Sequence, residues 1–85
     1  MQLSQEDTKP SVTRLKRARG QLDAVIRMLE AGEDCEAVVT QLAAVAKAVD
    51  RAGCAIIVTG LRQCLEDPSD EFSPERLEKL FLSFA

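Results

Sequence analysis

The sequence predicts an all-α protein with three helices per chain, and three observations lead to that fold class. Apolar residues recur at spacings of three and four positions, the period of an amphipathic helix. No segment alternates apolar and polar residues as a half-buried strand does. Hydrophobic residues make up 46% of the 85 residues, and the only aromatic residues are three phenylalanines near the C-terminal end. Small aliphatic side chains of this kind suit close packing of helices.

The first helix is expected over residues 11–31. Proline is tolerated at a helix start and serine is a good N-cap, so Pro10 and Ser11 indicate the beginning. Gly32 is a typical C-terminal stop. One face of this helix is apolar, formed by Leu15, Ala18, Leu22, Val25 and Leu29. Residues 1–10 are then a flexible N-terminal tail, and residues 11–85 form a single helical domain.

A second, long helix is expected over residues 34–66, a stretch without proline in which only Gly53 and Gly60 interrupt the pattern. A helix of this length extends roughly 50 Å at 1.5 Å per residue, farther than the first helix can cover. It is apolar over a wide arc that includes Val38, Leu42, Val45, Val49, Ala52 and Ile56. The uncovered part of this arc needs a partner. The simplest one is the same helix of a second copy, which gives an antiparallel four-helix-bundle dimer.

The third helix is expected over residues 74–84. A polar break at residues 66–71 contains Pro68 and separates it from the long helix. Ser73 followed by Pro74 is the pattern of an N-cap with proline at the first helical position. The apolar face of this short helix consists of Leu77, Leu80, Phe81 and Phe84.

Composition also restricts the compartment and the state of the cysteines. The sequence contains no run of 18 apolar residues, so we expect no transmembrane helix. The polar N-terminus lacks the layout of a secretion signal. We therefore expect a cytoplasmic protein that has no contact with membranes. Thiols are kept reduced in the cytosol, and the chain has three cysteines, so a disulfide framework is not expected.

Charge is distributed unevenly along the chain. The net charge is −3, but the first 32 residues carry six basic and four acidic side chains. The basic residues concentrate on the first predicted helix. A local basic patch matters more for nucleic-acid binding than the global sum, and this one is consistent with double-stranded DNA as a partner.

Cys35 and Cys64 lie at opposite ends of the long predicted helix. At 100° per residue they fall within about 20° of the same face, but roughly 43 Å apart along the axis. One straight helix cannot bring them together, whereas an antiparallel second copy places Cys35 of one chain near Cys64 of the other. A disulfide needs Cα atoms within about 7 Å, so any bond between them would be intermolecular or follow local unwinding. Alternatively both are small apolar core residues, as is Cys54, which lies between two apolar seams.

Several of these residues resemble a known family. The stretch RLKRARGQL at residues 14–22, followed by IRMLE at 26–30, is similar to the first helix of the CsoR/RcnR repressors. Cys35 and the segment VTQLAAV at 39–45 continue the pattern, and Cys64 occupies the second sensing position. The resemblance covers about residues 12–66. It implies a homotetramer, built as a dimer of antiparallel dimers, that binds operator DNA and releases it when an inducer binds.

The chain departs from the copper-sensing members at one position. They have a histidine four residues before the second cysteine, where this chain has Gly60, and the chain contains no histidine. Nickel, cobalt and formaldehyde sensing depend on histidine and are not expected. The sequence looks closest to the CstR-like persulfide-sensing branch, in which reactive sulfur species bridge the thiols matching Cys35 and Cys64; Cys54 is a candidate accessory thiol. No cofactor is then expected. The alternative inducer is Cu(I), held by the two thiolates.

The resemblance also indicates which residues contact DNA. Arg14 and Arg51 match positions implicated in family members, and nearby basic residues extend the patch: Lys16, Arg17, Arg19 and Lys47. Their role is phosphate contact and counterion release. A solvated charged face is the alternative.

Two other function classes fit the sequence less well. An enzyme, such as a sulfur-transfer carrier that uses Cys35, would lack a histidine base and a glycine-rich phosphate loop, so we expect no enzymatic activity. A purely structural helical module would explain the apolar faces but neither the basic stretch nor the spacing of the thiols.

Overall fold

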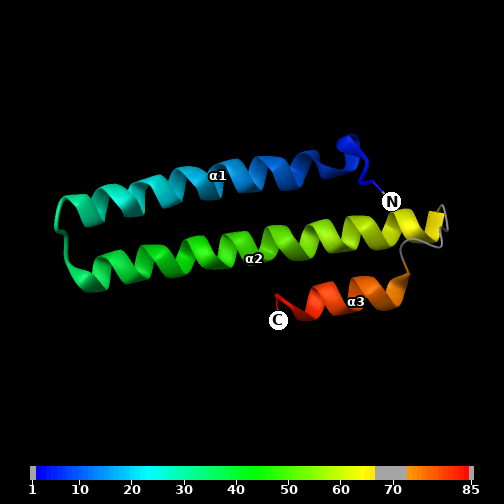
Figure 1. The fold of residues 1–85 in the computed structure, drawn as a ribbon. Coiled ribbons are helices and arrows are strands. Elements are labelled where there is room, and N and C mark those ends of the chain that lie inside the picture. Colours follow the sequence, from blue (N-terminus) through cyan, green and yellow to red (C-terminus); the bar gives the residue numbers. More distant parts are fainter. Residues whose placement is uncertain (1, 67–72, 85) are drawn as a thin grey trace.

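The computed structural model describes residues 2–66 and 73–84, which form three helices and no strand. Helix α1 spans Gln5–Glu30, α2 spans Cys35–Glu66 and α3 spans Pro74–Leu82. α1 and α2 form a long antiparallel hairpin, and α3 folds back along α2 on the side away from α1 (Figure 1). The all-α prediction with three helices is confirmed, and α2 is the central layer of the chain.

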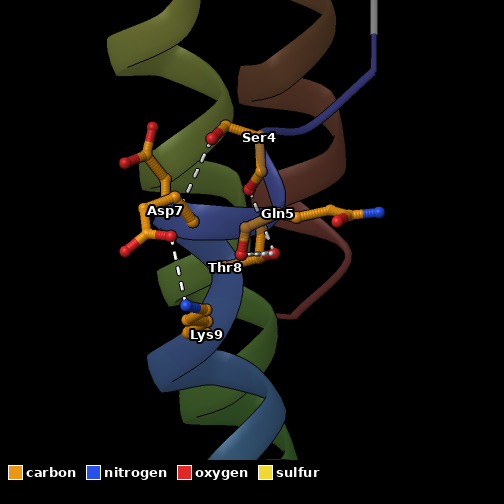
Figure 2. A network of polar contacts seen from close by, with 6 residues as sticks. Ser4, Gln5, Asp7, Thr8 and Lys9 are labelled. Atoms are coloured by element: carbon orange, nitrogen blue, oxygen red, sulfur yellow. Dashed lines mark hydrogen bonds and ion pairs between the residues drawn. The ribbon is translucent and has the colours of Figure 1, made fainter.

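The start of α1 was predicted wrongly, at residue 11 instead of residue 5. Ser4 is the N-cap: its Oγ accepts a hydrogen bond from the backbone N–H of Asp7 at 3.4 Å, and the Thr8 hydroxyl donates to the Ser4 carbonyl at 3.1 Å (Figure 2). Acidic residues in the first turn also suit the positive end of the helix dipole. Residues 5–10, assigned to the tail from sequence, are therefore helical. Pro10 lies inside the helix, and Ser11 is a buried residue rather than a cap.

A tight turn joins α1 to α2 close to where the sequence predicted it. Gly32 has a φ of +69°, and its N–H donates to the Leu29 carbonyl at 3.1 Å. The N–H of Glu33 donates to the Met28 carbonyl at 3.0 Å, which completes a Schellman motif. Asp34 then caps α2, since its Oδ2 accepts from the N–H of Ala37 at 3.2 Å. As a result Cys35 is the first residue of α2.

The hydrophobic core of the single chain is thin. Val25 packs with Val38 and Val45 between α1 and α2, and Met28 lies against them. Ala18 and Ala52 are also buried, and small side chains of this kind allow the two helices to approach closely. Many larger apolar side chains remain exposed on α1 and α2, including Leu15, Leu22, Ile26, Leu29, Val39, Leu42 and Val49. In the described ranges no helix has the length and hydropathy that a membrane crossing requires.

Helix α3 begins as the sequence predicted. The Ser73 Oγ accepts a hydrogen bond from the N–H of Arg76 at 3.3 Å, and Pro74 occupies the first turn. The helix ends at Leu82, slightly before the predicted residue 84, and Phe84 follows in a turn. Glu66 of the predicted polar break is the last residue of α2, and the rest of that break lies outside the described residues.

Candidate functional site

A basic groove of about 750 Å³ runs between α1 and α2. Four exposed basic side chains line it, Arg14 and Arg17 from α1 and Lys47 and Arg51 from α2. Residues three or four positions apart share one face of a helix, so each helix directs its pair to one side. Antiparallel pairing of the helices then brings the two pairs together. The lining contains these four basic residues and one acidic residue, Asp50, so positive charge dominates the groove.

The other two predicted DNA-binding residues, Lys16 and Arg19, are exposed but do not line this groove. At 100° per residue they lie about 100° and about 160° around α1 from Arg17. The structure thus brings four of the six predicted basic residues together and places two on other faces of α1.

Other residues of the groove were not assigned to it from the sequence, among them Cys54 and Gln21. Cys54 is half-buried and lines the groove beside the basic residues, rather than filling a closed core. Gln21 also lines it. The signal that identifies both is helical spacing, because Cys54 follows Arg51 by three positions and Gln21 follows Arg17 by four.

The two predicted sensing cysteines are far apart in the chain. Cys35 is exposed at the first residue of α2, and Cys64 is buried near its other end, with 6% of its surface exposed. Since α2 is one continuous helix, they lie roughly 43 Å apart along its axis. Both are thiols, and the described part of the chain contains no cluster of three His, Cys, Asp or Glu residues that would hold a metal ion. With α2 continuous, the two thiols of one chain cannot share a site.

The turn of α2 before Cys64 is covered by two other parts of the same chain. Gly60 is buried; a Cβ atom at this position would lie 3.5 Å from Cδ2 of Leu77 and 3.7 Å from Cδ2 of Leu3. The Gln63 side chain holds the N-terminal segment at this turn through two hydrogen bonds. Its Oε1 accepts from the backbone N–H of Ser4 at 2.8 Å, and its Nε2 donates to the backbone carbonyl of Gln2 at 3.1 Å.

An apolar cavity of about 370 Å³ lies where the N-terminal segment, α2 and α3 meet. Its lining consists of Gln2, Leu3, Ile56, Ile57, Gly60, Leu77 and Leu80. No sequence pattern indicates this covered region, because Leu3 is an isolated apolar residue in a polar segment.

Comparison with known proteins identifies the family. The model of the family described as "metal-sensitive transcriptional repressor" matches residues 7–83. The chain belongs to this family. It is 41% identical over 56 residues to the copper-sensing transcriptional repressor CsoR of Mycobacterium ulcerans (strain Agy99), a match that covers 66% of this chain and 48% of that relative. It is 50% identical over 40 residues to the uncharacterized protein YrkD of Bacillus subtilis (strain 168), covering 47% of this chain and 64% of that protein.

These comparisons confirm the resemblance to the CsoR/RcnR repressors at the level of the family. The family consists of transcriptional repressors, not enzymes. The matched segment spans about half the length of the mycobacterial relative and under two thirds of the Bacillus one.

Proposed function

We propose that this chain is a repressor that holds operator DNA through the basic groove between α1 and α2. The observation that carries the proposal is the convergence of Arg14, Arg17, Lys47 and Arg51, from two helices, on one groove. Guanidinium and ammonium groups in such an arrangement neutralise phosphates and release counterions, which supplies most of the affinity of sequence-independent DNA binding. Membership of a transcriptional repressor family supports duplex DNA as the partner.

The repressor works as an antiparallel dimer that assembles into a tetramer. A single chain leaves large apolar side chains uncovered along α1 and along the first half of α2, among them Leu22, Ile26, Val39 and Leu42. Contiguous exposed apolar surface of this kind marks an association surface. Antiparallel pairing of two α2 helices places Cys35 of one chain near Cys64 of the other, so each dimer has two equivalent dithiol sites.

Cu(I) is the inducer that the comparisons favour. The family is described as metal-sensitive, and a relative is named as copper-sensing. Two thiolates are soft donors that suit Cu(I) and hold it in linear geometry. Cys35 and Cys64 from two chains supply this donor set, and binding there relieves repression.

Reactive sulfur is the second candidate inducer, and a specific observation favours it. The chain has no histidine, and Gly60 stands at the position of the copper sensors' third ligand. In this scheme one thiolate attacks the outer sulfur of a persulfide RS–SH, and RS⁻ leaves. The second thiolate then attacks the inner, cysteine-bound sulfur of the new Cys–S–SH group, HS⁻ leaves, and a disulfide joins the two chains. Longer polysulfides leave a longer bridge.

A mobility-shift assay with DNA from upstream of the protein's own gene tests the function and separates the inducers. The reduced protein should bind this DNA, and binding should fall after addition of either Cu(I) or sodium polysulfide. Only polysulfide should add sulfur mass and give a covalent dimer on a denaturing gel. Cys54→Ala is compared with Cys35→Ala and Cys64→Ala, because it shows whether the thiol in the groove takes part in release. No DNA binding by the reduced protein contradicts the proposed repressor, and full release by both sensing-site variants contradicts the dithiol site.

A further inference from the structure

Helix α3 and the turn that follows it contact α2 at two glycines, positions where α2 itself has no side chain. The Phe84 ring lies directly against Gly53: a Cβ atom there would be 2.6 Å from Cε1 and 2.8 Å from Cζ. Leu77 covers Gly60 at the other end of α3. Gly53 and Gly60 are two helical turns apart and so lie on one face of α2. A side chain cannot be added at Gly53 unless the ring moves.

The two contacts lie beside the two parts of the candidate site. Gly60 is one turn before the buried Cys64. Gly53 is next to Cys54 and two residues after Arg51, both of which line the basic groove. Figure 1 shows α3 running back along α2 from the C-terminal end of α2 toward its middle. Cys64 lies near that end, two residues before Glu66. Thus α3 connects the thiol end of α2 with the groove segment.

We propose that α3 is the element that transmits a change at Cys64 to the basic groove, with Phe84 as its positioning residue. This inference rests on the proposed function, because it assigns the route by which an inducer weakens DNA binding. Cys64 is only 6% exposed, so a group attached to its sulfur presses on the segments that cover this end of α2. The adjacent turn of α2 is the one that Leu77 covers, and Leu77 is itself buried at 5%.

Helix α3 is the element that moves at least cost. It has nine residues, too few for a stable isolated helix, so its position depends on packing against α2. Leu77 is its only buried residue in the described range, whereas Leu80, Phe81 and Leu82 are exposed. When the Leu77 end shifts, the ring of Phe84 leaves Gly53. The segment of α2 that carries Arg51 and Cys54 then loses its contact on the α3 side, at Gly53, and glycine weakens a helix interior.

Two variants break the contact from opposite sides. Phe84→Ala removes the ring, and Gly53→Ala displaces it while strengthening the helix propensity of α2. A shared effect therefore cannot come from changed helix stability. Leu82→Ala is the matched control, since Leu82 is 60% exposed on the same short helix. In the mobility-shift assay both test variants should bind DNA as the wild type does without inducer, but the inducer should weaken binding at least about fivefold less.

A second measurement is independent of DNA. In a Cys35→Ser, Cys54→Ser background, methyl methanethiosulfonate transfers its CH₃S group to the Cys64 thiolate, and methanesulfinate leaves. The amide NMR signal of Gly53 should shift on this modification, and the shift should disappear with Phe84→Ala but persist with Leu82→Ala. An equal shift with and without Phe84 overturns the connector. A Phe84-dependent shift in a protein that no inducer releases from DNA upholds the connector and refutes the proposed function.

Discussion

The salt dependence of DNA binding gives a quantitative test of the basic groove. Arg17→Ala removes a cation that lines the groove, and Arg19→Ala removes the same charge from another face of α1. Both residues are exposed, so neither change disturbs the core. We expect Arg17→Ala to weaken operator binding and to flatten its salt dependence. Arg19→Ala should leave the salt dependence close to that of the wild type.

The expected magnitude follows from counterion release. On B-DNA the slope of log K against log salt changes by about 0.9 for each phosphate contact. When the salt concentration rises from about 50 to about 200 mM, the affinity falls by roughly 3.5-fold for each phosphate contact. Arg17→Ala should remove this factor once for each groove that contacts DNA. The four cations of one groove together should account for a slope of about 3.6.

Fluorescence anisotropy titrations of labelled operator DNA at a series of salt concentrations measure these slopes. A second pair of variants, Lys47→Ala inside the groove and Lys16→Ala outside it, repeats the comparison for lysine. If Arg19→Ala and Lys16→Ala lower the slope of log K against log salt as much as Arg17→Ala and Lys47→Ala do, the groove is not the surface that binds DNA.

Three further predictions concern stability and assembly. Gly32→Ala should lower the free energy of unfolding by about 1 kcal/mol, because Gly32 has a φ of +69°. Gly20→Ala should raise this free energy by about 1 kcal/mol, since Gly20 is helical with open space around it. Thermal unfolding followed by circular dichroism distinguishes the two signs. Val25→Ala should cost about 2 kcal/mol in chemical denaturation because it truncates the best-buried valine of the core, and a loss below about 0.5 kcal/mol would contradict that core. Leu42→Glu should shift the protein toward monomer in sedimentation equilibrium while Gln41→Glu does not, and an unchanged assembly would exclude this face from the interface.

Local signals in the sequence were enough to predict most of the helix boundaries. The turn at Gly32 and Asp34 and the start of α3 at Ser73 and Pro74 depend on hydrogen bonds between residues close in the chain, so the residue types alone indicate them. The start of α1 was missed because Pro10 followed by a serine resembles a helix start. Ser4 supplies an earlier cap, and the helix continues through the proline.

The arrangement of the candidate site depended on contacts that a linear pattern does not contain. The sequence identified six basic residues, but which of them share a groove depends on how α1 is rotated against α2; Arg17 lines the groove and Arg19 does not. The cover over Gly60 joins segments about sixty residues apart through Gln63 and Leu3, and no local signal predicts it. The separation of Cys35 and Cys64, in contrast, followed from helix geometry alone and is confirmed.

Mixing two inactive variants tests most directly whether the sensing site forms between chains. Cys35→Ala and Cys64→Ala protein should each bind operator DNA and fail to release it with inducer. After joint unfolding and refolding at equal concentrations, mixed dimers contain one intact Cys35–Cys64 pair, and inducer should release part of the DNA. A mixture that responds no better than either variant alone, or a single variant that releases DNA fully, would contradict a site shared by two chains.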